Sequence, residues 1–459
     1  MSDHCSRLVR KCDDDDGPPV KRQKLENVEV AKSDTKIHQL NNDCLELVFG
    51  HLKFKDLFCL AMASDQLDSA AAMVFRRKYG KNEIKFTGDG ITHLIEDEYL
   101  GFSVKQASTY KSFLHKFGAQ LSKLNIEVQS TMYTAVEPIL RNDCLVSLVE
   151  LSLGDCRYES SKLSVFGSIE QPFQNVEKLS LNRCHLNENA SKLNKWFPAL
   201  SSLSLYDNSY SDPNTIIAEY PKIVLFSAGS WRGPADLTEA QILAILRLNP
   251  TIQCLDIGLA ADGNELDFYR QVNDILPQLE RLQMCWEAKS FANGNEVITF
   301  KAVKNLTLNF TFNAFTGARV LPFAFDQLME MELINMPIVN NTWLEFIGYN
   351  KKLTKLMVLP FNEDGLFMDR PNNQDLLRIA KELPNLITLA IDVTRITTDC
   401  IVQFMQMCQS LTTLQLYWND LNSFNHNVWV DGTFFEQIDG EWNIPKRIIS
   451  PITLKRKGI

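Results

Sequence analysis

The sequence lacks any long hydrophobic run, and no stretch approaches the roughly 18 apolar residues that a membrane-spanning helix needs. The N-terminal segment MSDHCSRLVRKCDDDD also lacks the apolar core of a secretory signal. An excess of positive charge is missing as well, since 56 acidic and 47 basic side chains give a formal net charge of −9. We therefore expect a protein that is neither secreted nor bound to membrane, and not a general nucleic-acid binder.

Recognisable catalytic, phosphate-binding and metal-binding motifs are missing too. His4, Cys5 and Cys12 offer three metal ligands, but no fourth stands at the spacing of a zinc site. Gly88 and Gly90 lack the strand, glycine and helix setting of a phosphate-binding loop. No Ser/His/Asp set has a supporting local motif, although a catalytic set assembled from residues far apart in sequence would leave no such motif. We expect no catalytic residue, no metal site and no cofactor.

The chain does contain a repeated phrase: apolar, two variable residues, apolar, one variable residue, apolar. Copies start at Leu148, Val176, Leu200, Ile252, Leu279, Val303, Leu328, Leu353, Leu386 and Leu411, with degenerate copies at Leu121 and Ile223. Ten steps from Leu148 to Leu411 cover 263 residues, about 26 per step, as leucine-rich repeats do. We expect about 11–13 units over residues 81–421.

The cysteines fit this repeat better than a disulfide framework. The chain has 11 of them, an odd number, without framework spacing. Cys156 and Cys184 each follow the last apolar residue of a phrase by three positions, where this repeat takes Asn or Cys to bond turn backbone. Reduced, structural cysteines predict an intracellular protein, in the nucleus, the cytoplasm or both.

The repeat also predicts the fold class. Each phrase reads as a short strand with alternate residues facing the core, and the segments between phrases read as helices. The segment DLTEAQILAILRLNP offers Asp236 or Thr238 as N-cap, and NNQDLLRIAKELPNL offers Asn373. Strand followed by helix predicts an α/β leucine-rich-repeat solenoid, a horseshoe with parallel strands on the concave face and helices outside. The alternative, a doubly wound sheet, needs longer units and a phosphate-binding loop.

Residues 40–79 carry three apolar stripes that predict three short helices. In the first, Leu45, Val48, Phe49 and Leu52 recur at i, i+3, i+4 and i+7, with Asn42 or Asp43 as cap. The second stripe begins at Leu57 and the third at Leu67. Three helices of this size bury little surface alone, so we expect an apolar face left for a partner.

This block resembles the F-box, whose pattern is Leu-Pro, a short gap, Leu, Ile/Val-Phe, Leu, and then Asp-Leu. Those positions hold Leu40, Leu45, Val48, Phe49, Leu52, Asp56 and Leu57, with Asn41 in place of the proline. An F-box ahead of leucine-rich repeats is similar to the F-box/leucine-rich-repeat proteins, over most of the chain beyond residue 36. The resemblance implies a non-catalytic substrate receptor of an SCF ubiquitin ligase. It would bind the adaptor, and through it the cullin scaffold, and would hold an unknown protein substrate for ubiquitylation.

Residues 37–80 would then be the F-box, with adaptor binding assigned to Leu40, Asn41, Leu45, Val48, Phe49, Leu52 and Leu57. Ala63, Ser64 and Leu67 depart from the later part of the family pattern. One alternative is a helical cap over the first repeat. The alternative function is a leucine-rich-repeat interaction scaffold outside any ligase, with a degenerate F-box. A repeat protein with cryptic enzymatic activity is a third reading, supported only by its concave groove.

Side chains between the core positions of the strands are expected on the concave face. Their charges are mixed, so no ligand of one sign is indicated. Large aromatic and arginine side chains near strand ends suit interface anchors, the alternative being packing under neighbouring loops. The candidate substrate-binding residues are Tyr206, Trp231, Arg281, Trp286, Phe310, Tyr417 and Trp418. The extra segment FNEDGLFMDRPNNQ predicts a projecting loop.

The two ends complete the domain prediction. Residues 1–36 combine an acidic run, prolines and a basic cluster, and predict a disordered tail. Within them Lys21, Arg22 and Lys24 form either a nuclear import signal or an ordinary solvated linker. Residues 422–459 predict a C-terminal cap with a basic tail.

Overall fold

The structure is a computed structural model that describes 40–95, 98–103, 107–127, 146–154, 171–186, 188–230, 237–258, 265–286, 297–310, 323–334, 342–359, 370–417, 432–443 and 451–458. The expected tail, with Lys21, Arg22 and Lys24, lies outside these residues. So do Cys156 and most of the predicted projecting loop.

Three helices open the described chain: α2 (Asn42–Phe49), α3 (Phe54–Ala63) and α4 (Asp65–Tyr79). The first is capped by Asn41, not by Asn42 or Asp43, because the Asn41 side chain accepts a hydrogen bond from the Cys44 amide at 2.9 Å. Such a cap contributes about 1 kcal/mol to a helix. The Asn41 side chain therefore fixes the start of α2.

The predicted stripe on α2 is only partly right. Leu45 and Phe49 are buried, but Val48, a member of the same stripe, is 51% exposed. The helix ends at Phe49, so Leu52 lies beyond it and is only partly buried. Lys78 on α4 donates to the Gly50 and Leu52 carbonyl oxygens, at 3.1 and 2.8 Å, and holds the end of α2 against α4.

An aromatic cluster joins this three-helix block to the first strands of the sheet and to α5 (Ala107–Phe117). The Phe54 ring contacts the rings of Phe75, His93 and Phe113, with centroids 5.9, 4.6 and 5.8 Å away. Phe75 stacks on Phe117 with centroids 4.2 Å apart. Phe113 and Phe117 belong to α5, and His93 to β2 (Gly90–Ile95). The block and the start of the sheet therefore share one core.

The described strands form one 17-stranded sheet with two smaller pairs. Successive strands pair in parallel from β1 to β19. They are β1 (Glu83–Thr87), β4 (Lys123–Glu127), β5 (Glu150–Gly154), β6 (Lys178–Asn182), β8 (Ser202–Tyr206), β10 (Leu225–Gly229), β11 (Cys254–Gly258), β12 (Arg281–Trp286), β14 (Asn305–Phe310), β16 (Glu330–Ile334), β17 (Lys355–Leu359), β18 (Thr388–Asp392) and β19 (Thr413–Tyr417).

Antiparallel strands extend the sheet at both ends. β2 and β3 (Glu98–Ser103) continue from β1, while β21 (Ile452–Arg456) pairs with β19 and β20 (Trp442–Asn443). The small pairs are β7 (His185–Leu186) with β9 (Ser209–Tyr210), and β13 (Ile298–Phe300) with β15 (Phe323–Phe325).

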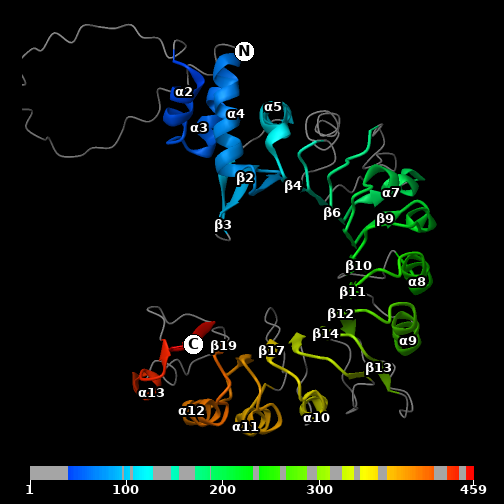
Figure 1. The fold of residues 1–459 in the computed structure, drawn as a ribbon, viewed down its shortest axis with the longest axis vertical. Coiled ribbons are helices and arrows are strands. Elements are labelled where there is room, and N and C mark those ends of the chain that lie inside the picture. The colour runs from blue at the N-terminus through cyan, green and yellow to red at the C-terminus, as the bar shows by residue number, and fades with distance from the viewer. Residues whose placement is uncertain are drawn as a thin grey trace, which may run out of the picture.

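Helices alternate with the strands, and Figure 1 shows them on the outer side of an open arc whose inner side is lined by strands. They are α7 (Leu193–Trp196), α8 (Glu239–Leu248), α9 (Glu265–Ile275), α10 (Thr342–Tyr349), α11 (Asn373–Glu382), α12 (Thr398–Met407) and α13 (Gly432–Ile438), with the 3-10 turns η2 (Gly118–Gln120), η3 (Glu188–Lys192) and η4 (Pro213–Ile216). The predicted solenoid-like α/β fold is thus observed.

Helix caps agree with the sequence in one case and differ in another. Thr238 caps α8 in a capping box with Gln241, as one of the two predicted alternatives. The cap of α11 is Asn372, not Asn373, and it accepts from the amides of Gln374 and Asp375. The two adjacent asparagines look alike in sequence, so only the backbone geometry distinguishes them.

The core is a ladder of the repeated apolar residues. Leu151, Leu179 and Leu203 lie side by side on neighbouring strands, and all are buried. Cys184 is buried too, and its thiol contacts the backbone oxygens of Leu153 and Asn182, as predicted for the turn position. All cysteines within the described ranges are free. Burying each leucine stabilises the fold by roughly 1.5–3 kcal/mol.

Candidate functional site

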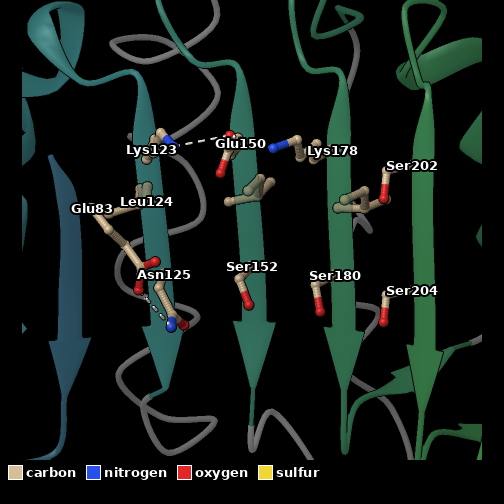
Figure 2. Close-up of a pocket in the computed structure, with 12 residues that line it drawn as sticks. Glu83, Lys123, Leu124, Asn125, Glu150, Ser152, Lys178, Ser180, Ser202 and Ser204 are labelled. Carbon is tan, nitrogen blue, oxygen red and sulfur yellow. Dashed lines mark hydrogen bonds and ion pairs between the residues drawn. The ribbon is translucent and has the colours of Figure 1, made fainter. Parts of the chain in front are cut away.

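A groove of about 200 Å³ crosses the inner face of the sheet from β1 to β8. The register of the phrase explains its lining, because alternate strand residues turn away from the core toward the inside of the arc. Its polar lining residues are Glu83, Lys123, Asn125, Glu150, Ser152, Lys178, Ser180, Ser202 and Ser204, and Figure 2 shows them along the strands.

One edge of this groove is a row of alternating charges. The Glu150 carboxylate lies 3.1 Å from the Lys123 ammonium and 2.8 Å from that of Lys178 (Figure 2). Burial alone would raise the pKa of Glu150, but the hydrogen bonds from Lys178 and Lys123 outweigh it and hold the pKa below its ordinary value. The positive charges of both lysines are therefore already engaged by one carboxylate.

The middle of the groove is a row of serines. Ser152, Ser180 and Ser204 pair with one another in register on β5, β6 and β8. Ser202 lies on the same face of β8, two residues before Ser204. Across the described part of the chain, the hydroxyls of these four serines have no protein hydrogen-bond partner. They are hydrogen-bonding groups open to a ligand.

The serine row continues into a more buried polar cluster. Ser227 on β10 pairs in register with Ser204 and with Asp256 on β11. The hydroxyls of Tyr206 and Ser227 face the carboxylate of Asp256 and act to lower its pKa. Burial raises the pKa of Asp256, and these hydroxyls together with the nearby charge of Arg281 oppose that rise only in part. Burial also raises the pKa of Tyr206, as does the carboxylate of Asp256.

A second hollow of about 230 Å³ lies farther along the inner face, from β12 to β17. It is lined by Arg281, Asn305, Leu306, Thr307, Glu330, Met331, Glu332, Lys355 and Met357. Lys355 and Glu330 form an ion pair at 3.3 Å across its floor. As in the first groove, both signs of charge are present and partly paired.

The predicted substrate-binding residues differ in position and in exposure to solvent. Tyr206 and Tyr417 are partly buried on the inner face, and Arg281 is exposed there. Phe310 is only 4% exposed, so the prediction of an exposed anchor at this position is wrong; its ring packs in the core. Trp231, Trp418 and the side chain of Trp286 lie outside the part of the chain that the structure describes. Two of the described candidates, Tyr206 and Arg281, come together near one feature, the carboxylate of Asp256.

The three-helix block carries the other candidate surface. Leu47 is 73% exposed, Val48 51% and Met62 50%, a concentration of apolar side chains in water on a small unit. Leu45, Phe49 and Leu57, which the sequence assigns to adaptor binding or to helix packing, are buried inside the block. Leu40 and Leu52 are partly buried, and Asn41 is exposed. Reading the sequence missed Leu47 and Met62, whose only signal was their hydrophobicity.

Other kinds of site find no support in the described ranges. No group of His, Cys, Asp and Glu side chains there could hold a metal ion. None of the helices described is long and apolar enough to cross a membrane.

Comparison with known proteins gives a distant structural likeness. No protein-family model matches the chain, and no curated protein does. Among solved structures, the chain is similar to one from the crystal structure of the Rad7 and Elc1 complex in yeast. That likeness has 15% sequence identity and a TM-score of 0.38, and covers 84% of this chain and 92% of that chain.

Proposed function

We propose that the chain is the substrate-recognition subunit of an SCF-type ubiquitin ligase, with the three-helix block acting as an F-box and a leucine-rich-repeat horseshoe holding a protein substrate. The observation that carries the proposal is the number of exposed apolar side chains on this small block, Leu47, Val48, Met62 and Met73, each at least 50% exposed. Apolar side chains left in water on so small a unit mark a surface that a partner covers.

The burial pattern divides the block between folding and binding. Leu45, Phe49 and Leu57 hold the three helices together, since they are within 1% of complete burial. Adaptor binding therefore falls to Leu47, Val48 and Met62, with Leu40, Asn41 and Leu52 as flanking contacts. In this assignment Asn41 contributes chiefly by capping α2.

The aromatic joint gives the block a mechanical part in this function. Phe54, Phe75 and Phe117 pack across the boundary between the block and the sheet. The two parts are therefore held in a fixed relative orientation and are not joined by a flexible linker. A substrate held on the inner face would keep a defined position relative to the adaptor and cullin scaffold. A rigid connection of that kind raises the effective concentration of a substrate lysine near the ubiquitin-conjugating enzyme.

In this proposal the chain performs no bond chemistry and uses no cofactor. Its place of work would be the nucleus, the cytoplasm or both, as the reduced cysteines and the basic cluster at Lys21, Arg22 and Lys24 suggest. Mixed and paired charges on the inner face favour a protein partner over a nucleic acid.

The test is a pull-down of the full chain with purified SCF adaptor. Wild type is compared with the double variant Leu47→Glu/Val48→Glu, which charges the exposed face and leaves the buried residues in place. Val224→Glu is the matched control, because Val224 is also an exposed apolar residue, at 40%, but lies in the array. We expect wild type and the control to bind and the double variant to lose binding. A wild type that fails to bind, or a double variant that binds equally well, would contradict the proposal.

The second candidate function is a protein-interaction scaffold outside any ligase, with the block serving as a cap. The observation that favours it is the core that α3 and α4 share with α5, which covers the apolar start of the array. A folded wild-type chain that does not bind the adaptor would support this function.

A further inference from the structure

We propose that the groove from β1 to β8 binds a short, extended and unphosphorylated segment of polypeptide, lying across the strands along the row of Ser152, Ser180 and Ser204. This inference deepens the proposed function, on which it rests, by naming the class of substrate that the inner face takes. It comes from the one run of hydrogen-bonding groups on the described inner face that the protein leaves unused.

The open hydroxyls have the spacing of a track. Ser152, Ser180 and Ser204 stand on adjacent strands, which lie about 4.8 Å apart in a sheet. A hydroxyl both donates and accepts, so each can meet either the N–H or the C=O of a ligand backbone. Small side chains also let that backbone approach the sheet closely. An extended polypeptide backbone carries an N–H or C=O group roughly every 3.3 Å, so it offers a polar group close to each hydroxyl in turn.

The ends of the track set the length of the ligand. Toward β10 the run of open hydroxyls ends, because Ser227 is buried next to Asp256, its register partner on β11. Toward β1 it ends at Asn125, whose amide donates to Glu83 and Glu127 at 3.1 and 3.3 Å. The open hydroxyls thus span two inter-strand steps, and the whole groove from β1 to β8 spans four, about 19 Å, which an extended chain covers in about six residues.

The charges at the edge argue against a phosphorylated or nucleic-acid ligand. Lys123 and Lys178 both contact Glu150, so a phosphate would have to compete with a carboxylate already in place. A second acidic group, Glu83, lines the same groove. Phosphate recognition normally uses unpaired Arg or Lys side chains as bidentate or multiple donors. Neutral backbone groups meet no such competition at the serines.

The lining also argues against a small-molecule site. The groove has no aromatic side chain among its described lining residues, and its apolar members are the leucines of the core, Leu124, Leu151 and Leu179. Pockets for small molecules are mostly apolar and aromatic, with a few converging polar groups. An open groove without aromatic walls that crosses several strands fits an extended chain instead.

The test uses the full chain on an immobilised array of unmodified dodecapeptides, with every serine- or threonine-containing peptide also present in phosphorylated form. Retained peptides are then measured by fluorescence polarisation at 50 and 300 mM NaCl. Ser180→Trp fills the middle of the groove, and Ser180→Ala removes only its hydroxyl. Thr307→Trp is the matched control, because Thr307 occupies the same strand position on β14, in the second hollow.

We expect a set of unmodified peptides to bind, with less than a threefold change between the two salt concentrations. Affinity should fall at least tenfold in Ser180→Trp and about two- to tenfold in Ser180→Ala, the range of one neutral hydrogen bond. Thr307→Trp should leave it unchanged. The proposal is overturned if no peptide binds, if Ser180→Trp binds as wild type does, or if the phosphorylated forms bind tenfold tighter. Adaptor binding is measured on the same preparations. A wild-type chain that binds peptides but does not bind the adaptor would count against the F-box assignment alone.

Discussion

The ring of Phe54 on α3 and the imidazole of His93 on β2 lie with their centroids 4.6 Å apart. This contact crosses the boundary between the three-helix block and the sheet. Both side chains are at most 4% exposed, so the boundary is sealed from water. The block and the beginning of the array should therefore unfold together, with Phe54 at the centre of their coupling.

The first prediction concerns that coupling. Phe54→Ala should lower the free energy of unfolding by about 3–5 kcal/mol, because it removes a buried ring and leaves a cavity among Phe75, Tyr79 and Phe113. Urea unfolding followed by fluorescence measures the loss. Met62→Ala is the control, since Met62 is 50% exposed, and it should change stability by less than about 0.5 kcal/mol. Equal effects of the two substitutions would contradict the shared core.

The second prediction concerns pH. Burial lowers the pKa of His93 below its ordinary value of 6.5. Below pH 6.5 the unfolded chain therefore takes up a proton that the folded chain resists, so the folded state loses stability as pH falls from 6.5 toward the lowered pKa. His93→Phe keeps the aromatic ring and removes the titration. Urea midpoints between about pH 7 and 5 should fall less steeply in this variant, and identical slopes would exclude His93 as the cause.

Much of the fold could be predicted because each repeat is specified by a short, local sequence pattern. Leu151, Leu179 and Leu203 repeat one short pattern, and that pattern alone implies strand, spacing and buried face. Cap positions were harder, since Asn372 and Asn373 differ only in backbone geometry.

The errors share a physical cause. An apolar period indicates that a helix has an apolar side, but not which of its residues are buried, and on α2 it does not separate buried Leu45 from exposed Val48. Phe310 has the residue type of an interface anchor, yet only packing decides whether its ring faces water. The serines were expected on the inner face, but their isolation from other hydrogen-bonding groups depends on what neighbouring strands place beside them. Contacts such as Tyr206 with Asp256 join residues 50 positions apart and leave no local pattern.

The third prediction concerns the buried carboxylate of Asp256. Its pKa is raised by burial, so the folded chain holds a proton there more tightly than the unfolded chain does. The stability that protonation contributes is present below the ordinary pKa of 3.8 and is lost as pH rises through the raised value. Asp256→Asn imitates the protonated form and keeps a carbonyl oxygen near Tyr206 and Ser227. It should be more stable than wild type at about pH 7, with the difference shrinking toward about pH 4; a less stable variant at neutral pH would contradict this reasoning.

The last prediction concerns the close approach of two strands. A Cβ atom at Gly229 would stand 2.3 Å from the carbonyl oxygen of Gly258 and 2.5 Å from its Cα, so Gly229→Ala must push β10 away from β11. Since both obstructing atoms are backbone, no side chain can move aside, and the expected loss is about 1–3 kcal/mol. Gly88→Ala is the matched control, because its Cβ would meet nothing within 4 Å. That substitution should leave stability unchanged or raise it by up to about 1 kcal/mol, by restricting the unfolded chain. Thermal unfolding of the two variants side by side separates steric crowding from the general effect of replacing glycine. If both shift the midpoint equally, the strands are not in contact at Gly229.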